Sequence, residues 1–99
     1  MQPSMKMINQ MQARLAKIQQ ELAETQVEGS AGGGAVKVIV NGQREFVSIK
    51  IDPEFVDPED VDMLEEAVGA AISDAMRRAQ ELSESKMGAL TGGLKIPGM

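Results

Sequence analysis

The central stretch of the chain, residues 35–53, alternates apolar and polar side chains with a period of two. Valine or isoleucine occupies every second position in a run on each side of an Asn41-Gly42 dipeptide. β-Branched residues at this period favour extended backbone, and Asn-Gly between two such runs is typical of a hairpin turn. The pattern therefore predicts an antiparallel β-hairpin with one apolar face.

Matching the faces of the two runs limits the register of this hairpin. A four-residue loop over residues 41–44 pairs Val38 with Val47. The same loop pairs Val36 with Ile49, so that one face is uniformly apolar. A two-residue Asn-Gly turn keeps these faces with poorer pairs, whereas a three-residue loop puts the two apolar sets on opposite faces. We therefore predict the four-residue loop, with the apolar face covered by flanking helices.

A first helix is predicted over residues 3–24, with Pro3 tolerated in its first turn. Lys6, Arg14 and Lys17 lie away from its apolar seam, where they face solvent or pair with an acid such as Glu21. The seam has the spacing of a coiled coil and extends over two to three heptads. Its residues are Met5, Ile8, Met11, Leu15, Ile18 and Leu22.

Residues 25–34 lose the helical pattern and are rich in glycine. Val27 could belong to a short third strand, and the glycines indicate a flexible link into the hairpin. A phosphate-binding loop is excluded, because no Gly-Lys-Ser/Thr follows and the next element is a strand.

A second helix is predicted from Asp57 to about Lys86. Asp57 is placed as the N-cap and Pro58 at the first helical position, with acidic residues in the first turn. Small residues around Gly69 either allow another backbone to approach or weaken the helix. The predicted apolar stripe is Val61, Leu64, Val68, Ile72, Ala75, Ala79 and Leu82.

Together these elements predict one α+β domain over residues 1–87, followed by a mobile Gly/Pro-rich tail at 88–99. At 1.5 Å per residue the helices would be ~33 and ~43 Å long, whereas a compact globule of this size has a radius of gyration near ~13 Å. The helices should project beyond the sheet, and narrow seams of this kind are buried by partner helices. We predict a homodimer with projecting helical arms.

The net charge of −5 is distributed unevenly along the chain. Eight acids and no bases lie between Asp52 and Glu66, whereas the remaining residues carry ten bases and seven acids. The acidity is therefore local to the start of the second helix. No apolar run approaches the ~20 residues of a membrane span and no signal-peptide pattern is present, so we expect a cytoplasmic protein.

Composition also limits the chemistry. Cysteine and histidine are absent, and the carboxylates sit where helix capping would put them, so we expect no enzyme, no cofactor and no small-molecule substrate. The acidic cluster lacks EF-hand spacing and predicts no metal site. Only two aromatic residues could stack on bases, which argues against sequence-specific recognition of single-stranded nucleic acid. A binding or architectural protein remains.

Short motifs along nearly the whole chain resemble those of the YbaB/EbfC family of bacterial nucleoid-associated proteins. The core Val-Lys-Val, Asn-Gly and Ile-Asp-Pro series is the most specific part. The matching residues are Gln10-Met11-Gln12, Val27, Gly29, Gly32, Val36-Lys37-Val38, Asn41-Gly42, Ile51-Asp52-Pro53, Asp74-Ala75, Arg78, Lys86-Met87 and the Gly/Pro/Met tail.

The resemblance implies a homodimer of α+β subunits that binds duplex DNA with protruding helices and acts in nucleoid organisation and gene regulation. Carried onto this chain, the implied DNA-binding residues are Lys6, Arg14, Lys17, Arg78 and Lys86, whereas Arg77 has no motif match. The expected dimer interface is formed by Ile8, Met11, Leu15, Ile18, Val38 and Val40.

Two other functions stay open at this point. In the first, the Met- and Gln-rich first helix offers its seam to a client protein, as in a chaperone-like module. In the second, the chain is a structural dimer without a ligand. Salt separates the first from DNA binding, because phosphate contacts weaken with salt and apolar contacts do not.

Overall fold

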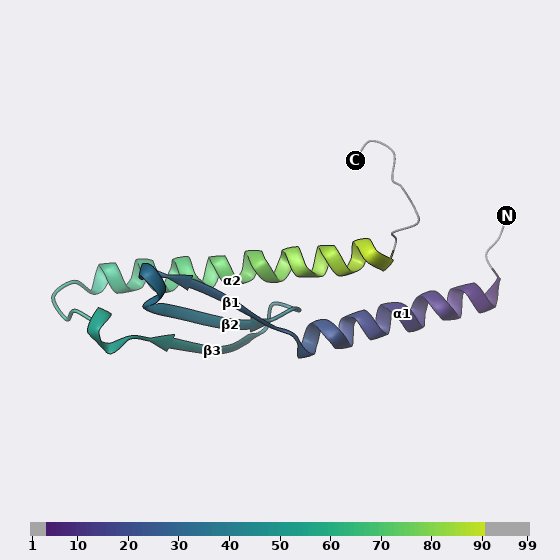
Figure 1. Cartoon of the computed structure of the whole chain (residues 1–99), viewed down its shortest axis with the longest axis horizontal. Coiled ribbons are helices and arrows are strands. Elements are labelled where there is room, and N and C mark those ends of the chain that lie inside the picture. Colours follow the sequence, from purple (N-terminus) through teal and green to yellow (C-terminus); the bar gives the residue numbers. More distant parts are fainter. Residues whose placement is uncertain (1–3, 91–99) are drawn as a thin grey trace, which may run out of the picture.

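The computed structural model describes residues 4–90, which form an α+β fold of two long helices and a three-stranded antiparallel sheet (Figure 1). The predicted fold class is confirmed. Within the sheet the strand order is β1-β2-β3. The elements are α1 (Met5–Glu24), β1 (Gln26–Ala31), the 3-10 turn η1 (Gly32–Gly34), β2 (Val36–Asn41), β3 (Phe46–Ile51), the 3-10 turn η2 (Pro53–Phe55) and α2 (Val61–Leu90).

The hairpin between β2 and β3 forms, but in a register two residues from the predicted one. Val38 pairs with Ile49, and Val36 pairs with Ile51. A shift by two residues keeps each side chain on its predicted face. The faces were therefore predictable from alternation alone, whereas the pairing was not.

The hairpin loop has three residues instead of the predicted four. The Asn41 N–H donates to the Glu45 carbonyl at 2.9 Å and leaves residues 42–44 in the loop. Arg44 has a φ of 65°, the left-handed conformation that closes three-residue loops. A β-bulge in the hairpin then shifts the register by one and returns the apolar residues to a common face. The four-residue prediction is wrong because face matching took no account of a bulge.

The predicted flexible link contains an ordered strand. β1 pairs with β2 along its whole length, with Val27 opposite Val40 and Gly29 opposite Val38. The three glycines of η1 all have positive φ, which L residues rarely adopt, and they turn the chain back into β2.

The start and the end of α2 both lie later than predicted. The Asp57 carboxylate accepts the Glu59 N–H at 2.9 Å within a turn, and Asp60 accepts the Met63 N–H at 3.2 Å. Asp60 therefore has the capping role expected of Asp57. At the other end α2 continues to Leu90 and includes the first residues of the predicted tail; Pro3 and residues 91–99 lie outside the described part.

The buried face of α2 is a stripe of alanines, of which the predicted stripe contained only Ala75 and Ala79. Val61 and Ile72 of that prediction are 49% and 37% exposed. Alanines bring the helix so close to β1 that a Cβ on Gly29 would lie 2.2 Å from the Ala75 nitrogen. The small residues thus serve the close approach that the sequence left open. The buried stripe is Ala67, Ala71, Ala75 and Ala79.

α2 lies over β1 and β2, and the core forms between them, with β3 farther from the helix (Figure 1). Val36, Val38 and Val40 of β2 have no exposed surface. Ile49 pairs with Val38 and so faces the α2 side of the sheet, yet it is 41% exposed, and Val47 is 45% exposed. One helix covers two strands and leaves Val47 and Ile49 of the third exposed, whereas Ile51 packs against the core.

The hairpin loop fixes the C-terminal end of α1. The Gly42 N–H donates to the Leu22 carbonyl at 2.7 Å, and the Asn41 side-chain amide donates to the Ala23 carbonyl at 3.2 Å. A Cβ at position 42 would lie 2.8 Å from the Leu22 oxygen, so the loop needs glycine there. From this anchor the rest of α1 extends away from the sheet.

The molecule is elongated, as the helix lengths predict. Its radius of gyration is 18.8 Å and its extents are 66 × 29 × 15 Å, well above the ~13 Å radius of a compact chain of this length. α1 and the C-terminal half of α2 project beyond the sheet in the same direction (Figure 1).

Gly29→Ala should destabilise the fold by about 2–3 kcal/mol, because the added methyl group forces α2 off the sheet. The midpoint of urea unfolding measures the change. Gly69→Ala is the matched control, since Gly69 is exposed on α2 and nothing lies within 4 Å of a new Cβ there. That variant should gain about 0.5–1 kcal/mol from helix propensity. Equal effects of the two substitutions would contradict the packing described.

Candidate nucleic-acid interface

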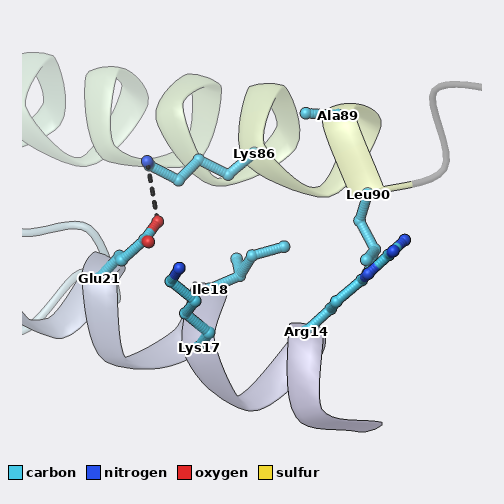
Figure 2. A pocket seen from close by; sticks show the side chains of 7 residues that line it. All are labelled: Arg14, Lys17, Ile18, Glu21, Lys86, Ala89 and Leu90. Atoms are coloured by element: carbon cyan, nitrogen blue, oxygen red, sulfur yellow. Dashed lines mark hydrogen bonds and ion pairs between the residues drawn. The ribbon is translucent and has the colours of Figure 1, made fainter. Parts of the chain in front are cut away.

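α1 and the C-terminal part of α2 line an open cleft of about 300 Å³ (Figure 2). The two helices approach each other at the base of α1 and leave this space beside it. Its lining residues are Arg14, Lys17, Ile18, Glu21, Lys86, Ala89 and Leu90.

Three cations from two helices converge on this cleft. Arg14 and Lys17 come from α1, and Lys86 comes from α2 (Figure 2). The one acid in the lining is Glu21, whose carboxylate pairs with the Lys86 ammonium at 3.2 Å. Both side chains are partly exposed, and ion pairs of this kind contribute little to stability. Lys86 can therefore exchange Glu21 for another anion at small cost.

The partner of Glu21 in this ion pair differs from the one that the sequence suggests. Local spacing pairs Glu21 with Lys17 on the same helix, but in the structure Glu21 pairs with Lys86 of α2. No local pattern connects residues so far apart in the chain. The contact exists because the hairpin loop and the alanine stripe fix the two helices independently.

Lys6 is on the same arm as the cleft but outside its lining. It is exposed and lies about three helical turns from Lys17, so that the two point to the same side of α1. The arm therefore carries a line of cations from Lys6 to Lys17. The neighbouring apolar seam is exposed at Met5, Ile8, Met11 and Leu15, and buried at Leu22.

Arg78 is not part of the cleft and is held by an acid. Its Nε lies 3.2 Å from the Asp74 carboxylate, and Arg77 pairs with the same carboxylate at 2.8 Å. Asp74 also accepts the Ser30 N–H of β1 at 3.1 Å. This N–H, followed by Arg77 and Arg78, lowers the pKa of Asp74. The hydrogen bonds that Arg77 donates to Asp74 and then to Glu81 raise the pKa of Arg77.

The structure thus divides the five predicted DNA-binding residues into groups. Arg14, Lys17 and Lys86 come together, Lys6 extends their line, and Arg78 joins an ion-pair cluster elsewhere on α2. The acidic segment from η2 to the start of α2 lies at the end of the molecule opposite to the free ends of the arms (Figure 1). The acidic segment and the cations of the arms therefore lie at different places along the long axis.

Among residues 4–90 no group of three or more histidine, cysteine, aspartate or glutamate side chains could hold a metal ion. None of the helices within these residues combines the length and the apolar character needed to cross a membrane.

The sequence pattern of the YbaB/EbfC DNA-binding family matches residues 1–94. The chain belongs to this family. A nucleoid-associated protein of Pelotomaculum thermopropionicum is 50% identical over 99 residues, which cover 100% of this chain and 94% of that one. A nucleoid-associated protein of Chloroflexus aggregans is 58% identical over 91 residues, which cover 92% and 91% of the two chains. The family is one of DNA-binding, nucleoid-associated proteins and not of enzymes.

A solved structure has the same fold. The crystal structure of an uncharacterized protein from Helicobacter pylori superimposes with a TM-score of 0.78 and covers 88% of this chain and 91% of its own. Sequence identity is 22%, so this likeness concerns the fold alone. The YbaB/EbfC resemblance seen in the motifs is confirmed by the family match.

Asp74→Asn should reduce stability at neutral pH, and the loss should vanish in acid. The Ser30 N–H and the two arginines hold the pKa of Asp74 below its ordinary value of 3.8 in the folded state. A depressed folded pKa stabilises the protein above the unfolded pKa, and this contribution is lost as pH falls through the folded pKa. Urea midpoints of both proteins between pH 7 and pH 2.5 measure the difference.

The difference should begin to shrink below about pH 4. Asp62→Asn, which removes an exposed acid from the first turn of α2, controls for the loss of one charge. A difference for Asp74→Asn that stays constant down to pH 2.5 would show that the carboxylate charge has no part in the contact.

Proposed function

We propose that this protein binds duplex DNA as a homodimer, mainly through phosphate contacts from its two helical arms, and that it acts in nucleoid organisation and gene regulation. The observation that carries the proposal is the convergence of Arg14, Lys17 and Lys86 on one open cleft of the arms. Membership of the YbaB/EbfC DNA-binding family supports DNA as the partner. The names of its relatives support a location at the nucleoid in the cytoplasm.

Phosphate is the part of DNA that these cations suit. Arginine and lysine supply donors to phosphate oxygens, and such contacts carry no sequence information by themselves. The cleft of about 300 Å³ is too small to enclose a duplex, whose major groove alone is about 12 Å wide. The arms therefore contact the DNA backbone with the cleft rim and the line of cations on α1.

Glu21 and the acidic end of the molecule set the limits of this binding. The Glu21 carboxylate is paired with the Lys86 ammonium in the free protein, so phosphate must displace this carboxylate to reach that lysine. The segment from Asp52 to Glu66 repels DNA, but it lies away from the free ends of the arms (Figure 1). These features favour moderate, salt-sensitive affinity at the arms and disfavour phosphate contacts along residues 52–66.

Dimerisation is supported by apolar side chains that one chain leaves in water. The α1 seam is exposed over most of its length, and Val47 and Ile49 of β3 and Ile72 of α2 are exposed as well. Exposed apolar surface of this extent marks an interaction site. Ile8, Met11, Leu15 and Ile18 remain in the proposed interface.

Val38 and Val40 do not remain in it. Both have no exposed surface, because α2 covers them within one chain. The exposed residues Val47 and Ile49 of β3 take their place in the proposal. A second copy supplies matching surfaces and doubles the number of cationic arms.

A protein-interaction function is the second candidate. Met5, Ile8 and Met11 are exposed on α1, and methionine adapts to varied apolar partners. Binding of an apolar client would persist at high salt, whereas phosphate contacts would not. A duplex-binding titration over a salt series therefore distinguishes the two functions.

Reversing the charge of the α1 cations should weaken DNA binding. We expect the double variant Arg14→Glu with Lys17→Glu to lose about tenfold or more in affinity for a random duplex at low salt, because it loses phosphate contacts. Each lost contact should also reduce the slope of log affinity against log salt by about 0.9. Fluorescence anisotropy from 50 to 200 mM salt measures both quantities.

Two single variants sharpen this experiment. Arg44→Glu, on the hairpin loop outside the cleft, should change affinity less than Arg14→Glu does at the same change in charge. Glu21→Gln frees Lys86 of its carboxylate partner and should strengthen binding. If the double variant binds DNA like the wild-type protein, α1 is not the contact.

Ile49→Asp should convert the dimer to a monomer, because it places a charge in the proposed apolar interface. Ser48→Asp is the matched control, since the neighbouring side chain points to the opposite face of β3. Sedimentation equilibrium at micromolar concentration should give twice the chain mass of 10.6 kDa for the wild type and the control. A wild-type mass of one chain would remove the dimer from the proposal.

A further inference from the structure

Two lysines lie opposite each other on the sheet surface that α2 leaves open. Lys37 of β2 pairs directly with Lys50 of β3 across the antiparallel ladder, and both are exposed. Side chains at directly opposite positions have Cβ atoms only about 4.5–5.5 Å apart. Because successive side chains alternate between faces, the pair lies on the face opposite to Val36 and Val38. This places it away from α2 and from the Arg14–Lys86 cleft.

This arrangement works against the stability of the sheet. Like charges directly opposite each other on a β-ladder are destabilising, and within residues 4–90 neither lysine forms an ion pair. A lysine on an edge strand protects the edge against pairing with other chains, which accounts for Lys50 in β3. It does not account for Lys37, because β2 is the central strand.

A hollow lies beside the pair. It has a volume of about 340 Å³, and its walls come from the end of η1 and from the end of β3. Gly34 leaves it open, since nothing lies within 4 Å of a Cβ at that position. The lining is Gly34, Ala35, Lys37, Lys50, Ile51, Asp52 and Pro53.

One acid in this lining must be accounted for. The Asp52 carboxylate accepts the Glu54 N–H at 2.9 Å and caps η2. It pairs with neither lysine in the described residues. The two ammonium groups therefore have six N–H donors that face solvent or an anion.

We propose that Lys37 and Lys50 form a phosphate-binding site on the open face of the sheet. A phosphate group brings charge that offsets the repulsion between the two lysines and acceptor oxygens for both ammonium groups. The phosphate belongs either to the DNA backbone or to a free phosphorylated molecule. In the first case the site rests on the proposed DNA-binding function and adds a contact outside the arms; in the second it is independent of that function.

Pyrophosphate titration of the isotope-labelled protein tests the site itself. In the wild type, NMR shifts should saturate for backbone amides in residues 34–37 and 50–52. In the double variant Lys37→Gln with Lys50→Gln they should be lost. This variant should fold, with a thermal midpoint at or above that of the wild type, because it removes a like-charge pair. The control Arg44→Gln with Arg77→Gln has the same change in net charge and should keep the shifts.

The double variant also identifies the source of the phosphate. If the site contacts DNA, the slope of log affinity against log salt should fall by about 0.9 per protomer bound, the share of the one phosphate that both lysines contact. An unchanged slope together with saturable pyrophosphate binding assigns the site to a free phosphorylated molecule.

The absence of saturable shifts in the wild type, or equal shifts in the lysine variant, overturns the proposal. Neither result affects the DNA-binding function, which the Arg14→Glu and Lys17→Glu variants test separately.

Discussion

The close contact between Gly29 and the backbone of α2 determines the arrangement of the molecule. A Cβ at this position would meet the Ala75 nitrogen at 2.2 Å, so the helix can lie where it does only because β1 presents a glycine and α2 presents alanines. Small residues allow the helix to pack closely on the sheet, but they cover only a narrow part of it. α2 therefore covers two strands and leaves the apolar side of β3 exposed, while its second half continues past the sheet.

A second constraint acts on the other arm. The Asn41 side chain and the Gly42 N–H bond to the last turn of α1, and these polar contacts fix where the helix leaves the sheet. Near this anchor the arms are joined by the pair Glu21–Lys86. The cleft thus lies between two independently anchored helices, and its one acid pairs with one of its three cations. In the proposed function, this carboxylate competes with DNA phosphate for Lys86.

The cations of the site could be identified from the sequence, but their arrangement could not. Local spacing places Lys6, Arg14 and Lys17 away from the α1 seam, because a helix repeats every 3.6 residues. It cannot show that Lys86 joins them, or that Arg78 is tied to Asp74 and through it to Ser30 of β1. Those contacts join elements far apart in the chain. They depend on how α2 is rotated over the sheet.

The sequence by itself determined two long helices, a β-hairpin with a defined apolar face, the position of the acidic segment and the family. Each of these depends on local periodicity, capping chemistry or short motifs. Only the tertiary structure decided the hairpin register, the third strand, the alanine face of α2 and the burial of Val38 and Val40. The physical reason is that alternation fixes which side of the sheet a residue faces. Strand pairing depends on a bulge, and burial depends on how closely the helix backbone approaches the sheet and on which element packs against the residue.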